Sequence, residues 1–285
     1  MPLSSAVLDQ SGEPISTEVD ARWLMAYAAG LGDGDACYLD TTRGITAHPL
    51  FPVCIEWPVF LATHRLPGAE GVTADERLRG VHATHDLVLH RPIRPGDRLS
   101  TTATVVGIER RAPGAYQVVR LDSVGAAGEA VCTTWYGTLY RGVDVDGPDR
   151  PAADAPPLPS PPPDEVPRSE VAIAITSLAA HVYTECARIW NPIHTDAAVA
   201  ARAGLPGIIL HGTASLALAV SQIVERECGG DPTRVKRVAG RFGAMVPMPS
   251  KITVSICERR GSAVHFEVRN AEAATAIRDA LVVIG

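Results

Sequence analysis

The chain has 285 residues, of which 46% are hydrophobic, and its formal net charge is −6. This length is enough for one or two domains with a substantial core. The acidic balance and the presence of only two lysines argue against nucleic acid as a partner.

We expect neither a membrane span nor a signal peptide from the sequence. There is no apolar run of about 18 residues that would predict a membrane span. The N-terminus, Met-Pro-Leu-Ser-Ser, lacks the basic segment and apolar run of a signal peptide. The six cysteines form no CxxC pair and no zinc-type cluster with histidine. We therefore expect a cytoplasmic protein with reduced cysteines, no bound metal and no contact with a membrane.

The first part of the chain predicts helices followed by strands. Residues 19–30 have the apolar spacing of a helix, and residues 30–35 (GLGDGD) form a loop. Residues 47–64 (AHPLFPVCIEWPVFLATH) are expected to form a loop followed by a longer apolar helix. Alternating apolar residues then predict strands at 81–90, 98–110, 115–124 and 129–141.

A proline-rich segment follows. Nine of the chain's 23 prolines lie between Gly147 and Pro167. Such a segment sustains neither a helix nor a central strand, so it predicts an extended linker. We therefore divide the chain into a domain at 1–146, a linker at 147–168 and a domain at 169–285.

The second part repeats the order of the first. Residues 169–176 predict a strand, and 177–189 a helix with Ser177 as its cap. Asp196 would cap a short helix at 197–203 that Gly204 ends. A long helix is predicted at 213–227, and strands at 234–242, 251–260, 263–270 and 275–285. Helices followed by antiparallel strands, occurring twice, indicate a duplicated α+β unit in which a sheet wraps around a helix. The two sheets would protect their edges by pairing.

Equivalent positions in the two halves support this duplication. Tyr27 and Tyr183 open corresponding segments. Six residues after each tyrosine lie Asp33 and Ile189, respectively. The first half therefore has a carboxylate where the second half has an apolar side chain.

The most informative segment runs from Tyr183 to Gly212 and reads YTECARIWNPIHTDAAVAARAGLPGIILHG. It resembles the MaoC-like hydratase/dehydratase family, which includes (R)-specific enoyl-CoA hydratases. The family pattern is a Tyr, then Ser-Gly-Asp-x-Asn-Pro-x-His, a small-residue helix and a turn ending in His-Gly. The matching residues here are Tyr183, Asn191-Pro192-Ile193-His194, Ala197, Ala198, Gly204 and His211-Gly212.

The resemblance implies a double hotdog fold, in which two antiparallel sheets each wrap around a central helix and are fused as a pseudo-dimer. The first half would be the degenerate hotdog that binds the acyl tail, and the second the catalytic or ligand-binding one. His194 would act on a water molecule, and Asn191 would orient either this water or His194. The family's catalytic Asp corresponds here to Ile189, because Ser-Gly-Asp is replaced by Ala187-Arg188-Ile189.

Replacing this Asp by Ile189 removes a group that the hydration reaction needs. Hydration of an enoyl thioester needs a base for the water and a proton source for the α carbon, and a carboxylate and an imidazole divide these tasks. The thioester oxygen also needs a hydrogen-bond donor, for which the N–H of Gly212 at a helix N-terminus is suited. Three carboxylates are candidates to compensate for Ile189. Glu185 would share a helix face with residue 189, although a solvated helix residue is the better explanation of it. Asp196 is better explained as a helix cap, and Asp33 lies in the other half.

The other histidines are expected to be structural or exposed, and His211 to support a turn. No dinucleotide-binding loop and no G-x-S-x-G elbow is present.

Three functions remain open. The first is a hydro-lyase for 3-hydroxyacyl or enoyl thioesters of CoA or an acyl carrier protein, in fatty acid or polyketide metabolism, with no cofactor. The second is a binding or scaffold subunit that keeps the acyl pocket without turnover. The third is thioester hydrolysis or a cyclising addition on the same fold. The chain could be complete alone, form a homodimer or pair with a partner hotdog chain.

Overall fold

The computed structural model describes residues 2–157 and 167–285. Its helices are α1 (Ala21–Leu31), α2 (Ala36–Leu39), α3 (Pro52–Ala62), α4 (Ala74–Leu78), α5 (Ala179–Ala187), α6 (Ala197–Arg202) and α7 (Gly212–Glu227). Its strands are β1 (Leu3–Ser4), β2 (Ile15–Glu18), β3 (Gly80–Leu89), β4 (Arg98–Arg111), β5 (Gly114–Val124), β6 (Ala130–Arg141), β7 (Val145–Asp146), β8 (Pro167–Ile175), β9 (Val235–Phe242), β10 (Ser250–Cys257), β11 (Ala263–Arg269) and β12 (Thr275–Ile284).

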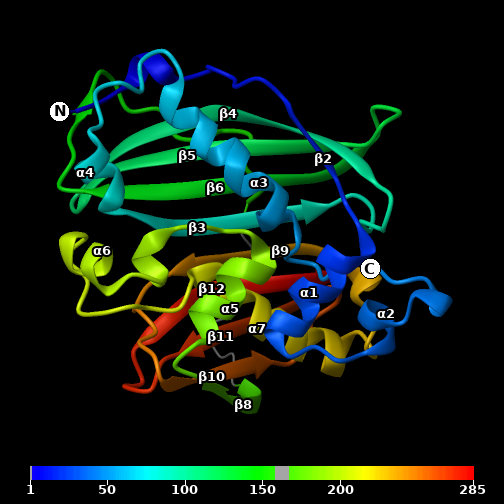
Figure 1. Cartoon of the computed structure of the whole chain (residues 1–285). Coiled ribbons are helices and arrows are strands. Elements are labelled where there is room, and N and C mark those ends of the chain that lie inside the picture. The colour runs from blue at the N-terminus through cyan, green and yellow to red at the C-terminus, as the bar shows by residue number, and fades with distance from the viewer. Residues whose placement is uncertain (1, 158–166) are drawn as a thin grey trace.

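A ten-stranded antiparallel sheet spans both halves, in the order β2-β4-β5-β6-β3-β9-β12-β11-β10-β8. Each half contributes five strands to this sheet, and the two halves arrange them alike. From the centre outward the order is β3-β6-β5-β4-β2 in the first half and β9-β12-β11-β10-β8 in the second. The fold is therefore a duplicated unit with a pseudo-twofold axis between β3 and β9. Figure 1 shows this arrangement, with α3 lying across the first-half strands and α5 and α7 over the second-half strands. The expected α+β double hotdog is confirmed.

The centre of the molecule is held by two equivalent helices. Helices α1 and α5 pack against each other, and the hydroxyls of Tyr27 and Tyr183 lie 3.3 Å apart. Both tyrosine side chains are buried. The hydrophobic cluster around them includes Leu87 of β3 and Val238 of β9. One continuous core therefore joins the halves, and its burial is the main force that holds them together.

Strands β3 and β9 form the junction within the sheet. Their register pairs Asp86 with Ala239 and Val88 with Arg237. Asp86 and Arg237 are therefore diagonal neighbours on one face of the sheet. The Arg237 guanidinium donates hydrogen bonds of 2.8 and 2.6 Å to the two carboxylate oxygens of Asp86. This bidentate ion pair is largely buried and fixes the register between the two halves.

Some expectations differ from the structure in detail. Ser177 does not cap α5, because the helix begins after Leu178, which makes no side-chain cap hydrogen bond. The predicted linker includes residues 158–166, which lie outside the described residues. Strand β2 at the first edge of the sheet was not predicted from the sequence. No helix among the described residues is long and apolar enough to cross a membrane.

Candidate functional site

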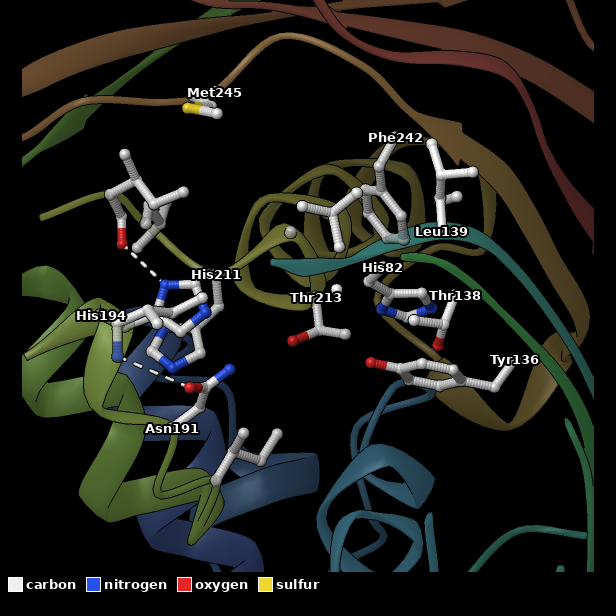
Figure 2. A pocket seen from close by; sticks show the side chains of 18 of the residues that line it. His82, Tyr136, Thr138, Leu139, Asn191, His194, His211, Thr213, Phe242 and Met245 are labelled. Atoms are coloured by element: carbon white, nitrogen blue, oxygen red, sulfur yellow. Dashed lines mark hydrogen bonds between the residues drawn. The ribbon is translucent and has the colours of Figure 1, made fainter. Parts of the chain in front are cut away.

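A cavity of about 640 Å³ lies between the two halves. Its walls come from α3, β3 and β6 of the first half, and from the loop after α5, the start of α7 and β9 of the second half. This volume is typical of small-molecule sites, which are mainly apolar with a few polar groups. Figure 2 shows the cavity with His194 and His211 on one side and His82 and Tyr136 on the opposite side.

The loop after α5 brings the motif residues to the cavity wall. Helix α5 ends at Ala187 because Arg188 adopts the left-handed conformation, with φ of 56°. The Arg188 guanidinium stacks over the Trp23 ring at 3.8 Å, which stabilises this turn. Asn191 then caps a short 3₁₀ turn at Pro192–His194. Ile189, Asn191 and His194 all line the cavity as a result.

His194 is held in one tautomer. Its Nδ1 lies 2.9 Å from the carbonyl oxygen of Ile209. Since a carbonyl only accepts hydrogen bonds, Nδ1 carries the proton and Nε2 keeps a free lone pair. Burial lowers the pKa of His194 to about 4, although the hydrogen bond to Ile209 partly opposes this change. The imidazole is therefore neutral at pH 7 and has an acceptor available.

His211 is a cavity residue that we expected only to support a turn. It precedes α7, and its ring stacks on that of His194 with centroids 3.7 Å apart. Its Nε2 lies 3.3 Å from the Thr184 hydroxyl, and its Nδ1 is buried without a partner among the described residues. Burial, and secondly the neighbouring His194, keep the pKa of His211 well below its usual value. The sequence placed His211 beside Gly212 but gave no sign of this stacking.

The N-terminus of α7 opens onto the same cavity. Gly212 and Thr213 line the wall, and the N–H groups of a helix's first turn have no partner inside the helix. A Cβ on Gly212 would lie 3.0 Å from the Phe242 ring, so the glycine keeps this approach open. Tyr183 is buried beneath the site, where its hydroxyl donates to Thr213 Oγ1 at 3.2 Å. Tyr183 thus supports the wall and does not itself line the cavity.

The carboxylates considered as substitutes for the missing Asp do not take its place. Glu185 is exposed and is not among the cavity-lining residues. The expectation that it shares a helix face with Ile189 is wrong, because α5 ends two residues before Ile189. Asp196 caps α6 by accepting from the N–H groups of Ala198 and Val199. Ile189 itself is 5% exposed, and its side chain offers no proton acceptor.

Asp33 occupies the position in the first half that corresponds to Ile189 in the second half, and it belongs to a separate polar cluster. It follows α1, whose C-cap Gly32 is left-handed like Arg188. The Ser221 hydroxyl donates to Asp33 at 2.8 Å, and His48 Nε2 lies 3.2 Å from the same hydroxyl. Burial raises the pKa of Asp33 to about 6. Neither Asp33 nor His48 lines the cavity that contains His194.

A carboxyl group that sequence reasoning missed does line the cavity. Glu56 lies in the otherwise apolar helix α3 and is 2% exposed. Its Oε1 accepts a 2.6 Å hydrogen bond from the Thr134 hydroxyl, whereas Oε2 has no partner among the described residues. Burial raises its pKa to about 8, so it is mostly protonated at neutral pH. In the sequence, Glu56 could have been recognised as the single acidic residue of an otherwise apolar helix.

His82 was also expected to be structural, but it lines the cavity together with His64. Simple alternation along a strand puts His82 and His85 on opposite faces. The register of β3 against β6 shifts between His82 and Thr84. The extra residue of such a bulge reverses the alternation of side chains between the two faces, so His82 and His85 lie on the same face. The rings of His82 and His85 therefore approach to a centroid distance of 5.3 Å.

Comparisons with known proteins agree with this architecture. The family described as "MaoC like domain" matches residues 159–280, and the "FAS1-like, dehydratase domain region" matches residues 6–134. A 53-residue segment is 47% identical to peroxisomal enoyl-CoA hydratase 2 of Arabidopsis thaliana. That segment is 19% of this chain and spans only 17% of the plant protein's length.

Solved structures resemble the whole chain. A MaoC-like dehydratase from Phytophthora capsici aligns with a TM-score of 0.85 and 21% identity, covering 98% of this chain and 96% of that one. The peroxisomal multifunctional enzyme type 2 of Drosophila melanogaster aligns with a TM-score of 0.77 and 20% identity, covering 96% of this chain and 48% of that one. At this level of identity these likenesses show the fold alone. The two family matches, together with this fold, show that the second half contains a MaoC-like domain and that the first half is a FAS1-like dehydratase region.

Proposed function

We propose that the chain catalyses reversible hydration and dehydration of an acyl thioester, with His194 as the only proton-transferring side chain. The observation that carries this proposal is that the free Nε2 of His194 and the N-terminal turn of α7 at Gly212 line one cavity. A thioester oxygen beside the Gly212 N–H would lie where the helix dipole and the unpaired N–H groups favour negative charge.

In the dehydration direction, one imidazole can perform both proton transfers. His194 Nε2 takes the α proton, and the C–H electron pair moves into the thioester, whose oxygen accepts a hydrogen bond from Gly212. The bond from the β carbon to its hydroxyl then breaks as the α–β double bond forms. The imidazolium returns its proton to the departing hydroxyl, which leaves as water. Hydration follows the same steps in reverse.

Ile189 makes this reaction slower than in family members with an aspartate. A carboxylate at residue 189 would favour the imidazolium and help to position the water. The apolar side chain removes both effects and leaves His194 a weak base, with a pKa of about 4. We therefore propose a low turnover number that depends on substrate positioning by Asn191 and by the cavity walls.

The first half would hold the acyl tail. Val53, Trp57 and Phe60 of α3 face the cavity from that side. CoA and an acyl carrier protein remain equivalent as thioester carriers, since both present the same thioester to His194. No cofactor takes part in the proposed reaction.

Hydration of crotonyl-CoA and of longer 2-enoyl-CoAs tests the proposal, followed by the loss of ultraviolet absorbance of the conjugated thioester. We expect measurable hydration by the wild type and a loss of about 100-fold or more in His194→Gln. The exposed His90, which does not line the cavity, provides a matched control, and His90→Gln should retain full activity. Equal rates in the wild type and in His194→Gln would refute a catalytic role for His194.

A second candidate function is an acyl-thioester-binding or scaffold subunit without turnover. The observation that favours it is Ile189, because the described residues provide no ionised carboxylate at this wall to assist His194. Calorimetry with saturated acyl-CoAs separates the two candidates. Binding without hydration of any enoyl-CoA, including after addition of a partner hotdog chain, would support the binding subunit.

A further inference from the structure

The cavity has a second polar wall, formed by β3 and β6 of the first half. His82, Tyr136 and Thr138 line it, across the cavity from His194 and His211 (Figure 2). An alkyl chain would place only carbon and hydrogen against this wall. The wall is therefore more polar than a pocket for a plain fatty acyl tail requires.

Polar atoms of this wall have no partner in the protein. His82 Nε2 and Thr138 Oγ1 are buried without a hydrogen bond among the described residues. The Tyr136 hydroxyl points toward the middle of the cavity (Figure 2). A buried donor or acceptor that stays unpaired destabilises the protein, and native proteins rarely leave several together. A ligand with its own polar group would satisfy them.

The wall is rigid. The rings of His82 and Tyr136 stack with centroids 3.7 Å apart and an interplanar angle of 14°. Phe60 packs against Tyr136 at 4.4 Å and Phe242 against His82 at 4.6 Å. Because these contacts fix the rings, the polar atoms are already in place before a ligand binds, which favours recognition.

The wall is also uncharged. Burial keeps the pKa of His82 well below its usual value and raises that of Tyr136. Arg77 and Arg141 line the cavity but donate hydrogen bonds to backbone carbonyls of the protein. A hydroxyl or carbonyl group therefore finds neutral donors and acceptors at His82, Tyr136 and Thr138.

We propose that the acyl group of the substrate carries a second, uncharged oxygen function, a hydroxyl or a carbonyl, remote from the thioester, and that His82, Tyr136 and Thr138 bind it. This inference rests on the proposed function, since it assumes that the thioester lies beside Gly212 and that the acyl group crosses the junction between the halves. It narrows the substrate from acyl thioesters in general to oxygenated ones.

Calorimetry with saturated acyl-CoAs tests this inference, because these compounds lack the groups needed for turnover. Butanoyl-, hexanoyl-, octanoyl- and decanoyl-CoA would each be compared with the ω-hydroxy and the ω-oxo derivative of the same length. We expect at least one oxygenated compound to bind about tenfold more tightly than its alkyl counterpart, which is the effect of one well-formed buried hydrogen bond.

Variants locate the preference. Tyr136→Phe and Thr138→Val each remove one polar group with little change in shape, and each should reduce the preference at least about threefold without weakening the binding of the alkyl compound. His82→Phe should act in the same direction if it folds. His90→Gln should leave the preference intact, because His90 is outside the cavity.

The outcomes are distinguishable. If all the CoA thioesters bind but no oxygenated compound exceeds its alkyl counterpart, the inference is wrong and the proposed function stands. A preference that persists in both Tyr136→Phe and Thr138→Val would also overturn it. If no thioester binds at all, the proposed function fails together with this inference.

Discussion

The imidazole of His194 stacks on that of His211 at an interplanar angle of 27°, and both rings are held neutral by burial. Burial disfavours the charged form of both rings, and a proton on His194 would further disfavour one on His211. This arrangement gives His194 an accessible lone pair at neutral pH but little basicity.

The pH dependence of turnover should reflect the low pKa of His194. A general base must be unprotonated, and this group becomes protonated only as the pH falls through about 4. We expect kcat/KM for enoyl-CoA hydration to be nearly constant between pH 5.5 and 7.5 and to fall below about pH 4.5. An acidic limb centred near 6.5, the ordinary value for histidine, would contradict the buried environment described for His194.

Ile189→Asp should raise hydration activity by about tenfold or more, because a carboxylate restores the second proton-transfer group and favours the imidazolium. The pH–rate profile should shift with it, and the acidic limb should move upward from about 4. Ile189→Asn is the matched control, since it is polar and of similar size but cannot ionise. If the two variants have equal rates, the carboxylate is not what the site lacks.

Gly212→Ala should lower kcat/KM about tenfold or more. The added methyl group would lie 3.0 Å from Phe242 and would narrow the space in which the thioester approaches the helix N–H groups. The double variant Gly212→Ala/Phe242→Leu relieves this contact and should recover part of the activity. Unchanged kinetics in Gly212→Ala, measured with the same enoyl-CoA, would place the thioester elsewhere.

Glu56→Gln should remove a pH-dependent loss of stability. The folded-state pKa of Glu56 is raised by burial from 4.5 to about 8. Because the folded protein holds this proton more tightly, stability falls as the pH rises from about 4.5 to 8. The free energy of unfolding of the variant minus that of the wild type should therefore increase by at least about 2 kcal/mol from pH 5 to pH 9. The exposed Glu13→Gln should show no such gain, and urea unfolding at several pH values measures both.

Arg237→Met should destabilise the protein by roughly 2–4 kcal/mol, because it leaves the Asp86 carboxylate buried and unpaired at the junction of the halves. The double variant Asp86→Asn/Arg237→Met should be more stable than the single one. The exposed pair of Glu18 and Arg98, 3.7 Å apart, is the control, and its loss should cost less than about 1 kcal/mol. Urea unfolding that gives equal losses for both pairs would show that the junction does not depend on this contact.

Periodicity and residue spacing predicted most of the architecture. Alternation along the strands and the proline-rich segment indicated two similar halves, and the Asn-Pro-x-His spacing selected Asn191 and His194, which share a cavity with Gly212. These features are local, so the sequence carries them directly. The helix face that Glu185 was expected to share with Ile189 does not exist, because one left-handed residue, Arg188, ends the helix before Ile189.

The opposite wall of the cavity was beyond such reasoning. His82 reaches it through a register shift in β3, and strand alternation is reliable only where no bulge occurs. Glu56 stands in a helix whose other residues are all apolar, so its sequence shows no polar face to indicate where the carboxyl group points. Both residues come from the half without the motif, and they lie near it because the two halves pack together through β3 and β9 and through α1 and α5.

The two equivalent turns, one with Gly32 and Asp33 and the other with Arg188 and Ile189, illustrate what covalent fusion permits. In a homodimer every substitution is made twice, so a change that suits one end of the assembly is imposed on the other. A single gene encoding both halves frees them from this constraint. One end of this molecule has a polar cluster around Asp33, and the other has Ile189 at the corresponding position in the wall of a cavity, a difference that the two ends of a homodimer could not have.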